Sequence, residues 1–238
     1  MNEFYDGDDV TEEKVVNNKS KESESDIPVR WKEATTQMDY GIDVQASSVL
    51  LFGEIMDGSL YDIITRIRAI LHMRKDEHKN DPINLIINSD GGSVYEALGI
   101  IDYIQSLDVK VNTICRGRAM SAAALILCAG TGIRAASQFS TIMFHEISSD
   151  IYGKSSDMKA NVQHMEKLEE ILLEILKSNS NKDIEFWKNV TIKDYYITPT
   201  DALNLGVIDA IIPPKHKRGW YGINNNFIIN MFGCIYFC

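Results

Sequence analysis

The sequence predicts an α/β fold built on a mostly parallel sheet. Short apolar runs of strand length alternate along the chain with longer segments whose apolar residues recur at helical spacing. Glycine and proline separate the two kinds of segment. For example, Pro82 precedes the apolar run at 83–88, and Gly91 and Gly92 follow it. Because strands that alternate with helices pair in parallel through crossover connections, this pattern indicates an α/β architecture.

Ordered structure is expected from about Asp39, and the first strand and helix follow closely. Residues 48–53 form an apolar run that ends at a glycine, which predicts a strand. Residues 59–73 are predicted to be helical because apolar side chains recur on one face and charged side chains on the other. The apolar face holds Leu60, Ile63, Ile64, Ile67, Ile70 and Leu71.

The middle of the chain alternates strands with helices. Proline and glycine residues flank the apolar run at 83–88, which is therefore predicted to be a buried strand. The small residues that precede Cys128 predict a compact helix. The predicted elements are a strand at 83–88, a helix at 94–107, a strand at 109–114, a helix at 121–129 and a short strand at 141–144 that ends at His145.

A long amphipathic helix is predicted over 155–178. Its apolar side holds Met158, Val162, Met165, Leu168, Ile171, Leu172 and Ile175. Beyond it, Thr198-Pro199 predicts a turn into a helix at 202–205, which Gly206 closes. The last predicted strand, 207–212, stops at two prolines.

Composition limits the classes of function. The chain has 238 residues, of which 45% are hydrophobic, so it can form one large domain or two small ones. A net charge of −10 argues against nucleic-acid binding through counterion release and fits anionic membrane surfaces poorly. No uninterrupted apolar run reaches the length of about 18 residues that a spanning helix needs. Four cysteines without a CxxC pair or metal-like spacing indicate a reducing compartment.

The ends of the chain differ from its middle. Residues 1–26 contain nine acidic and three basic residues, hence −6 of the net −10. We expect residues 1–37 to be a disordered acidic tail, 38–214 to be the folded domain and 215–238 to be a separate tail. In this last tail a basic cluster, 215–218, precedes an uncharged segment that either docks on the domain, stays disordered or touches a membrane surface.

Three strand-to-helix or strand-end junctions carry residues capable of chemistry. Gly91 and Gly92 open the backbone to a close approach, Ser121 begins a helix of small residues, and His145 ends a strand. Each has a structural explanation: a tight turn, a helix N-cap and a hydrogen-bonded histidine, respectively. Together they supply a nucleophile, a base and N–H donors for a developing oxyanion, which are the parts needed for covalent acyl transfer.

The order of these parts is informative, because Ser121 precedes His145 and an acid would follow. That order differs from the α/β-hydrolases and from chymotrypsin-like enzymes. Five segments of the chain resemble five motifs of the ClpP peptidase family, in the same order. They are the segment 86–102 with its two glycines, Gly117-x-Ala119-x-Ser121, Met143-x-His145, the helix start at 153–157 and Lys193-Asp194. The similarity covers roughly residues 39–213.

This resemblance implies a role for each matching residue. Ser121 would be the nucleophile, His145 the general base and then acid, and Asp194 the residue that orients the imidazole. Asp183 and Asp201 are nearby competitors, and only the family motif favours Asp194. The N–H groups of Gly92 and Ala122 would form the oxyanion hole. The segment that contains Gly91, Ser93 and Val94 would pair with the peptide as an added strand.

The resemblance also implies an architecture and partners. The fold would be the ClpP/crotonase-like superhelix of repeated ββα units with a protruding handle helix. Two seven-membered rings would stack through the handle helices into a chamber, and a hexameric ATPase unfoldase would feed unfolded protein into it. No cofactor, metal, nucleic acid or membrane partner is expected, and a cytoplasmic location follows, with an organelle or an infected host cell as alternatives.

The chain also departs from the family pattern. Glu146 and Ile147 replace the usual glutamine and proline, Ser148-Ser149-Asp150 replaces a glycine-rich stretch, and Lys193 replaces a common arginine. A lysine cannot form the bidentate carboxylate pair of an arginine, so contacts between rings are expected to differ. Two other functions fit less well: a non-catalytic subunit of a mixed ring, which would typically lack a triad residue, and a crotonase-type acyl-CoA enzyme, which would not need this triad.

Overall fold

A computed structural model describes residues 35–36, 38–148 and 153–214 of the chain. The predicted tails therefore lie outside the described residues, except for residues 35 and 36. Ser149 and Asp150, in the stretch that departs from the family pattern, also lie outside them.

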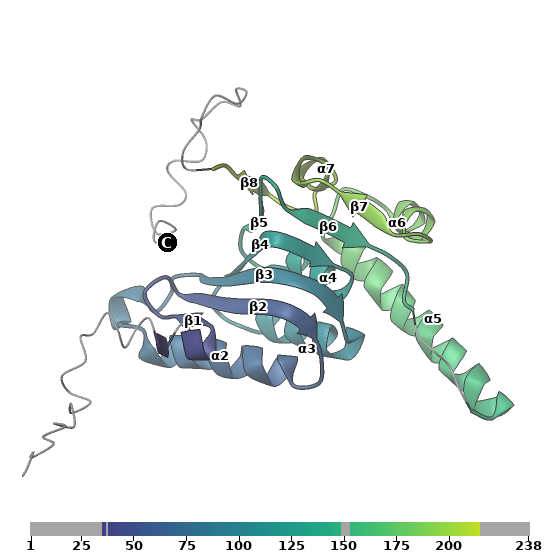
Figure 1. The fold of residues 1–238 in the computed structure, drawn as a ribbon, viewed down its shortest axis with the longest axis horizontal. Coiled ribbons are helices and arrows are strands. Elements are labelled where there is room, and N and C mark those ends of the chain that lie inside the picture. The colour runs from purple at the N-terminus through teal and green to yellow at the C-terminus, as the bar shows by residue number, and fades with distance from the viewer. Residues whose placement is uncertain (1–34, 37, 149–152, 215–238) are drawn as a thin grey trace, which may run out of the picture.

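The described strands form one sheet with mostly parallel pairing (Figure 1). The strands are β1 Ile42–Asp43, β2 Ser48–Ile55, β3 Ile83–Gly92, β4 Val111–Met120, β5 Arg134–Ser137, β6 Thr141–Phe144, β7 Tyr195–Ile197 and β8 Ala210–Ile212. Their order is β1-β2-β3-β4-β5-β8, with β6 paired to β4 and β7 paired to β6. The β1–β2 and β6–β7 pairs are antiparallel and the other pairs are parallel, which confirms the predicted fold class.

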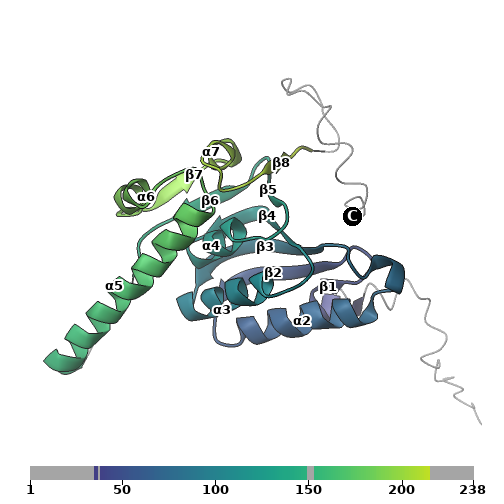
Figure 2. The same ribbon diagram turned by 180° about the vertical axis from the view of Figure 1, so that it is seen from behind.

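Helices cover the sheet and extend beyond it. They are α2 Ser59–Met73, α3 Val94–Gln105, α4 Ala122–Cys128, α5 Ser155–Ser178, α6 Ile184–Val190 and α7 Pro199–Asn204, with the short 3₁₀ helix η2 Asp76–His78. Figure 2 shows α2, α3 and α4 on one face of the sheet, with α5 projecting away from the body. No helix in the described ranges is long and apolar enough to cross a bilayer.

The core explains why the helix after Ser121 consists of small residues. Every residue of α4 is buried, because the helix packs between the sheet and its neighbours α3 and α5. A helix that is apolar on all sides belongs in such a position. Beneath it, Ile83, Leu85 and Ile87 of β3 alternate with more exposed residues and are fully buried. The helix that follows Ser121 and the strand β3 beneath it are therefore held inside the core.

Three strands run further than the sequence predicts, and the first of them, β2, ends at Ile55 rather than at residue 53. The segment Asp90-Gly91-Gly92 is not a separate turn but the end of β3, where Glu54 pairs with Gly91 and Ile55 with Gly92. Likewise β4 continues to Met120, where it pairs with Met143 of β6. Gly53 of β2 and Gly117 of β4 have positive φ where the pairing changes register, so these strands bulge and still keep a neighbour.

The second half of the chain contains elements that the sequence pattern did not indicate. Strand β5 is only four residues long and includes an arginine, and α6 is a short helix without a clear apolar period. The last strand begins at Ala210 rather than at residue 207. Helix α7 begins at Pro199 rather than at residue 202, because a proline fits the first helical position and Thr198 with Asp201 forms a capping box.

Helix α5 has the predicted bounds, but its two halves have different surroundings. In the C-terminal half Leu168, Leu172 and Leu176 are buried against the domain. In the N-terminal half Met158 and Val162 are 41% and 45% exposed. Ile171, in the second half of the stripe, is also 47% exposed. Packing within the chain therefore explains the leucines of the second half but not Met158, Val162 or Ile171.

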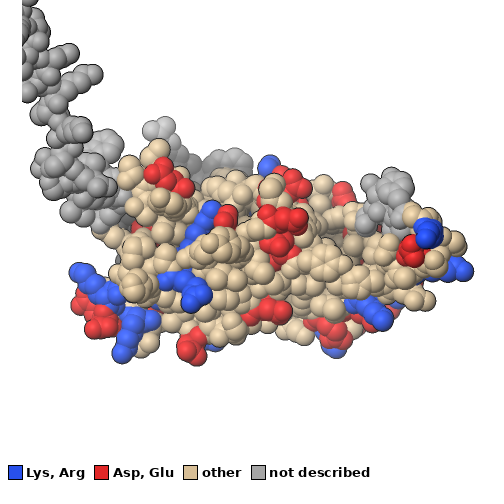
Figure 3. Space-filling view, turned by 90° about the horizontal axis from the view of Figure 1, so that it is seen from below, with Lys and Arg blue, Asp and Glu red and all other residues tan. Residues whose placement is uncertain are grey.

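The surface seen from below carries charges of both signs. Figure 3 shows lysine and arginine side chains close to aspartate and glutamate side chains, in small groups separated by broad uncharged areas. On this face the charges of the described residues do not form a large patch of one sign.

Arg134 and Asp209 connect strand β5 to the segment that leads into the edge strand β8. Arg134 Nη2 donates to Asp209 Oδ1 at 2.6 Å, and both Nε and the backbone N–H of Arg134 donate to Oδ2. Arg134 also donates to the carbonyl oxygens of Asn179 and Cys128. Burial acts to raise the pKa of Asp209, but the hydrogen bonds and the charge of Arg134 outweigh it and leave this pKa below its ordinary value.

This pair predicts how stability depends on pH. Because the carboxyl pKa is lowered by folding, the stabilisation is present above the unfolded pKa of about 3.9 and is lost as pH falls through the lower, folded pKa. We expect Asp209→Asn to lower the free energy of unfolding at pH 7 by about 1 kcal/mol, since the carboxylate stays partly exposed to water. Urea unfolding between pH 3 and pH 7 measures this difference.

The control is Asp62→Asn, which removes an exposed ion pair with Arg66 on α2. This variant should lose only a few tenths of a kcal/mol. A deficit in Asp209→Asn that stays constant down to pH 3, or that equals the control, would contradict the assignment.

Candidate active site

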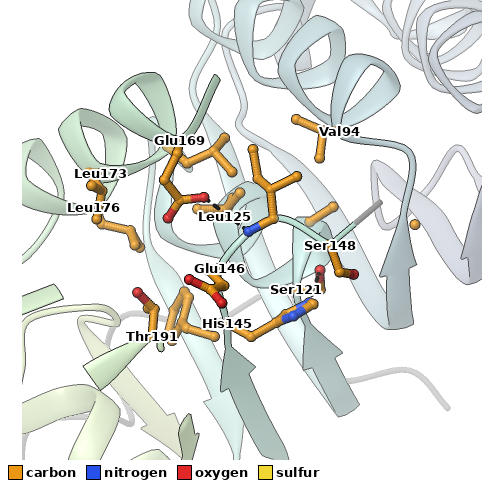
Figure 4. A pocket seen from close by; sticks show the side chains of 15 residues that line it. Val94, Ser121, Leu125, His145, Glu146, Ser148, Glu169, Leu173, Leu176 and Thr191 are labelled. Atoms are coloured by element: carbon orange, nitrogen blue, oxygen red, sulfur yellow. Dashed lines mark hydrogen bonds between the residues drawn. The ribbon is translucent and has the colours of Figure 1, made fainter. Parts of the chain in front are cut away.

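The structure brings two of the predicted catalytic side chains together at one edge of the sheet. Ser121 follows β4 and His145 follows β6, and these two strands are parallel neighbours. Their carboxyl ends therefore meet, and Ser121 Oγ lies 2.7 Å from His145 Nε2 (Figure 4). This distance is that of a hydrogen bond suited to proton transfer.

Ser121 stands at the N-cap position of α4 but does not cap the helix with its side chain. The N-cap interpretation therefore does not account for this serine. Its hydroxyl contacts the imidazole instead. Ala122 N–H is the first amide of α4 and, like the first amides of any helix, has no acceptor inside the helix. Both Ser121 and Ala122 line the same pocket.

The backbone of Ser121 has a conformation that side-chain-bearing residues rarely adopt. Its φ is 52° and its ψ is −125°. The neighbouring structure holds it there, because Ser121 N–H donates to the carbonyl of Met143 at 2.8 Å and Ser121 C=O accepts from Ala124 N–H at 2.9 Å. A strained residue that the surroundings fix in place is typical of functional sites, and strain of this kind costs about 1–3 kcal/mol.

The end of β3 must consist of glycines for this turn to form. A Cβ atom on Gly91 would lie 2.6 Å from the carbonyl oxygen of Met120 and 2.8 Å from Ser121 Cβ. A Cβ atom on Gly92 would overlap the carbonyl oxygen of Ile55. Both glycines also have φ values, 94° and 138°, that favour glycine. The backbone of Gly92 can therefore lie beside Ser121 at the mouth of the pocket.

Of the other residues predicted to bind peptide, one lines the pocket and two form hydrogen bonds within the fold. Val94 lines the pocket. Ser93 is used within the fold, since its N–H donates to Ile55 O at 2.7 Å and its hydroxyl caps α3 by accepting from Glu96 N–H. Gly91 N–H donates to Ser89 Oγ.

Asp194 is close to His145 in the strand register but does not contact it. Phe144 pairs with Tyr195 across the antiparallel β6–β7 ladder, so the next pair outward would be His145 and Asp194. Within the described ranges no hydrogen bond or ion pair joins the two side chains. The Asp194 carboxylate instead accepts from the Tyr196 hydroxyl at 3.5 Å.

The two competing aspartates have structural positions. Asp183 caps α6 by accepting from Phe186 N–H at 2.8 Å. Asp201 forms the capping box of α7 with Thr198, whose hydroxyl and N–H groups lower the pKa of this carboxyl. Sequence reasoning could not separate the three aspartates, whereas the hydrogen bonds show that two of them are committed to helix ends.

A pocket adjoins the serine and histidine, and the sequence did not reveal its outer wall. Helix α5 contributes Leu172, Leu173, Leu176 and Glu169 to it, while α4 and β6 contribute Leu125 and Phe144. The spacing of the apolar residues on α5 was the available signal, but it did not show which of them reach the site.

The described cysteines are not alternative nucleophiles. Cys115 and Cys128 are buried. Burial raises the pKa of the Cys115 thiol to about 11 and that of the Cys128 thiol to about 12. Because the thiolate is the reactive form, neither is activated at neutral pH. Among the residues that the structure describes, no group of three or more histidine, cysteine or acidic residues is placed to hold a metal ion.

Comparisons with known proteins identify the family to which the chain is similar. The family model described as Clp protease matches residues 32–215. The chain is 35% identical over 168 residues to ATP-dependent Clp protease proteolytic subunit 2 of Synechococcus sp. (strain CC9605), which covers 70% of this chain and 84% of that protein. It is 36% identical over 155 residues to ATP-dependent Clp protease proteolytic subunit 1 of Prochlorococcus marinus subsp. pastoris, which covers 65% of this chain and 79% of that protein.

The strained backbone predicts an unusual order of stability for two variants. Ser121→Ala keeps the Cβ atom, whereas Ser121→Gly relieves the strain at positive φ at the cost of a more flexible unfolded chain. We expect Ser121→Gly to be about 1 kcal/mol more stable than Ser121→Ala in urea unfolding. At Ser106, where φ is −81°, the alanine variant should be the more stable one. If the glycine and alanine variants had the same order of stability at Ser121 and at Ser106, the assignment of backbone strain to Ser121 would be contradicted.

Proposed function

The chain belongs to the Clp protease family, and from this premise we propose that it is an active serine endopeptidase whose catalytic residues are Ser121, His145 and Asp194. The observation that carries the proposal is the 2.7 Å contact between Ser121 Oγ and His145 Nε2, made by a serine that is not used as a helix cap. Family membership supports the peptidase activity, and the geometry supports the choice of nucleophile and base.

The proposed reaction proceeds through an acyl-enzyme. His145 Nε2 takes the proton of Ser121 as Oγ attacks the carbonyl carbon of the peptide bond. The N–H groups of Gly92 and Ala122 stabilise the oxyanion that forms. His145 then gives the proton to the leaving amine as the C–N bond breaks. Water, activated by the same imidazole, hydrolyses the ester and restores the serine.

Asp194 is proposed to hold the imidazole in the tautomer that presents a free Nε2 to the serine. Two observations support this choice: its place in register with His145 and the use of Asp183 and Asp201 as helix caps. For this role Asp194 must come within hydrogen-bond distance of His145 Nδ1, so a shift of the segment before β7 is part of the proposal.

The substrates and partners are proposed from the family. We propose that residues 38–214 form the peptidase domain, with separate tails at 1–37 and 215–238, and that copies assemble into stacked rings of seven. Unfolded protein would enter the chamber with the help of a hexameric ATPase, in keeping with the name ATP-dependent Clp protease given to the relatives. The exposed apolar residues in the N-terminal half of α5 support contact with another copy.

The catalytic assignment predicts the outcome of labelling and kinetics. A serine-directed fluorophosphonate should label the wild-type chain and leave Ser121→Ala unlabelled. Asp194→Asn should lower kcat for a fluorogenic peptide by about a hundredfold or more, because the imidazole loses its orienting carboxylate. Mass spectrometry and steady-state kinetics measure the two effects.

Asp183→Asn is the matched control, since it changes a nearby helix cap and should leave kcat within a few-fold of wild type. Equal labelling of Ser121→Ala would contradict the choice of nucleophile. Equal losses of kcat in the two aspartate variants would contradict the choice of Asp194.

The exposed half of α5 predicts the effect of added charge on assembly. Met158→Glu combined with Val162→Glu should separate stacked rings into smaller particles, because two carboxylates would be buried at the contact. Size-exclusion chromatography with light scattering measures the mass. Gln163→Glu adds a charge on another face of the helix and should leave the mass unchanged, and a mass equal to the wild type in the double variant would contradict this role.

A further inference from the structure

The pocket beside Ser121 has a composition that the proposed mechanism does not explain. Gly92, Ser121 and His145 line one part of it, so it adjoins the place where the attacked carbonyl must lie. Its remaining wall is mostly apolar, with leucine, valine, isoleucine and phenylalanine side chains, and also includes Ser148, Thr191 and two glutamates, Glu146 and Glu169. The side chain of the residue that supplies the attacked carbonyl would therefore meet both apolar surface and carboxylates.

Glu169 is fixed in place by the backbone next to the histidine. Ile147 N–H donates to Glu169 Oε2 at 3.0 Å, which links α5 to the segment after β6. A carboxylate has two acceptor oxygens, so this bond orients the group and leaves its other oxygen able to accept a further hydrogen bond. The side chain comes from the same half of α5 that supplies the leucine wall.

Glu146 directly follows His145 and brings a second carboxylate to the same pocket. Figure 4 shows Glu146 and Glu169 between α5 and the Ser121–His145 pair. Among the residues that the structure describes, neither carboxylate forms an ion pair, and the pocket lining includes no lysine or arginine. Glu146 is exposed to solvent and Glu169 is half-buried. A cation bound in the pocket would therefore give two carboxylates without an ion-pair partner a counter-charge.

We propose that this pocket binds the side chain of a substrate lysine or arginine, so that the enzyme cleaves after basic residues. The inference rests on the proposed peptidase function. The methylene stem of the basic residue would pack against Leu125, Phe144 and Leu172, and its charged end would reach the two carboxylates. A leucine would fill the apolar part but leave the carboxylates without a counter-charge, and a glutamate would be repelled.

Matched peptides test this preference with the full-length protein. The substrates are fluorogenic peptides identical except for the residue before the scissile bond, which is lysine, acetyl-lysine, leucine or glutamate. Acetyl-lysine keeps the stem of lysine and removes its charge. We expect kcat/KM for lysine to exceed that for acetyl-lysine by about tenfold or more, as for a charge-assisted hydrogen bond.

Conservative variants test the source of the preference. Glu146→Gln combined with Glu169→Gln removes both charges and keeps an oxygen that can accept from Ile147 N–H. The ratio of kcat/KM between lysine and acetyl-lysine should fall to about one. Glu170→Gln, which removes the charge of an exposed neighbour that does not line the pocket, should keep the wild-type ratio.

The outcomes separate this inference from the proposed function. Cleavage that does not distinguish lysine from acetyl-lysine, or a lysine preference that survives in the double variant, would overturn the inference and leave the peptidase in place. If no peptide is cleaved, the proposed function fails, and the inference is then decided by fluorescence polarisation with Ser121→Ala. In that measurement peptides ending in lysine should bind about tenfold more tightly than peptides ending in acetyl-lysine, and equal affinities would overturn it.

Discussion

The whole site depends on the strained turn at Ser121. The residue lies at positive φ between a buried strand and a buried helix, and the hydrogen bond from its N–H to Met143 fixes it against β6. This turn directs Oγ away from the helix that it begins and toward His145. Local preference alone would favour a serine that caps the helix, so tertiary structure must supply the energy that holds it otherwise.

The surrounding elements follow from this constraint. Gly91 must lack a Cβ atom because the turn occupies the space beside it, and α4 must consist of small apolar residues because it lies between the sheet and its neighbouring helices. The C-terminal half of α5 then covers α4 and forms the outer wall of the pocket, while its N-terminal half extends beyond the domain. One helix thus contributes both to the site and to an exposed apolar surface.

The sequence predicted those features that repeat at a regular spacing or form a known motif. The bounds of α2, β6 and α5 were confirmed, as was the mostly parallel sheet. The extension of β3 and β4 through glycines was not predicted, because glycine usually marks the end of a strand. Ser121 and His145 were expected to meet and do so. The pocket wall could not be predicted, since it depends on how α5 crosses α4.

A crystal structure of the assembled protein with a fluorophosphonate bound to Ser121 tests the central claim most directly. The account predicts that the phosphonyl oxygen accepts hydrogen bonds from the N–H groups of Gly92 and Ala122, and that Asp194 lies within hydrogen-bond distance of His145 Nδ1. A phosphonyl oxygen turned toward solvent, or a different carboxylate beside Nδ1, would contradict the account.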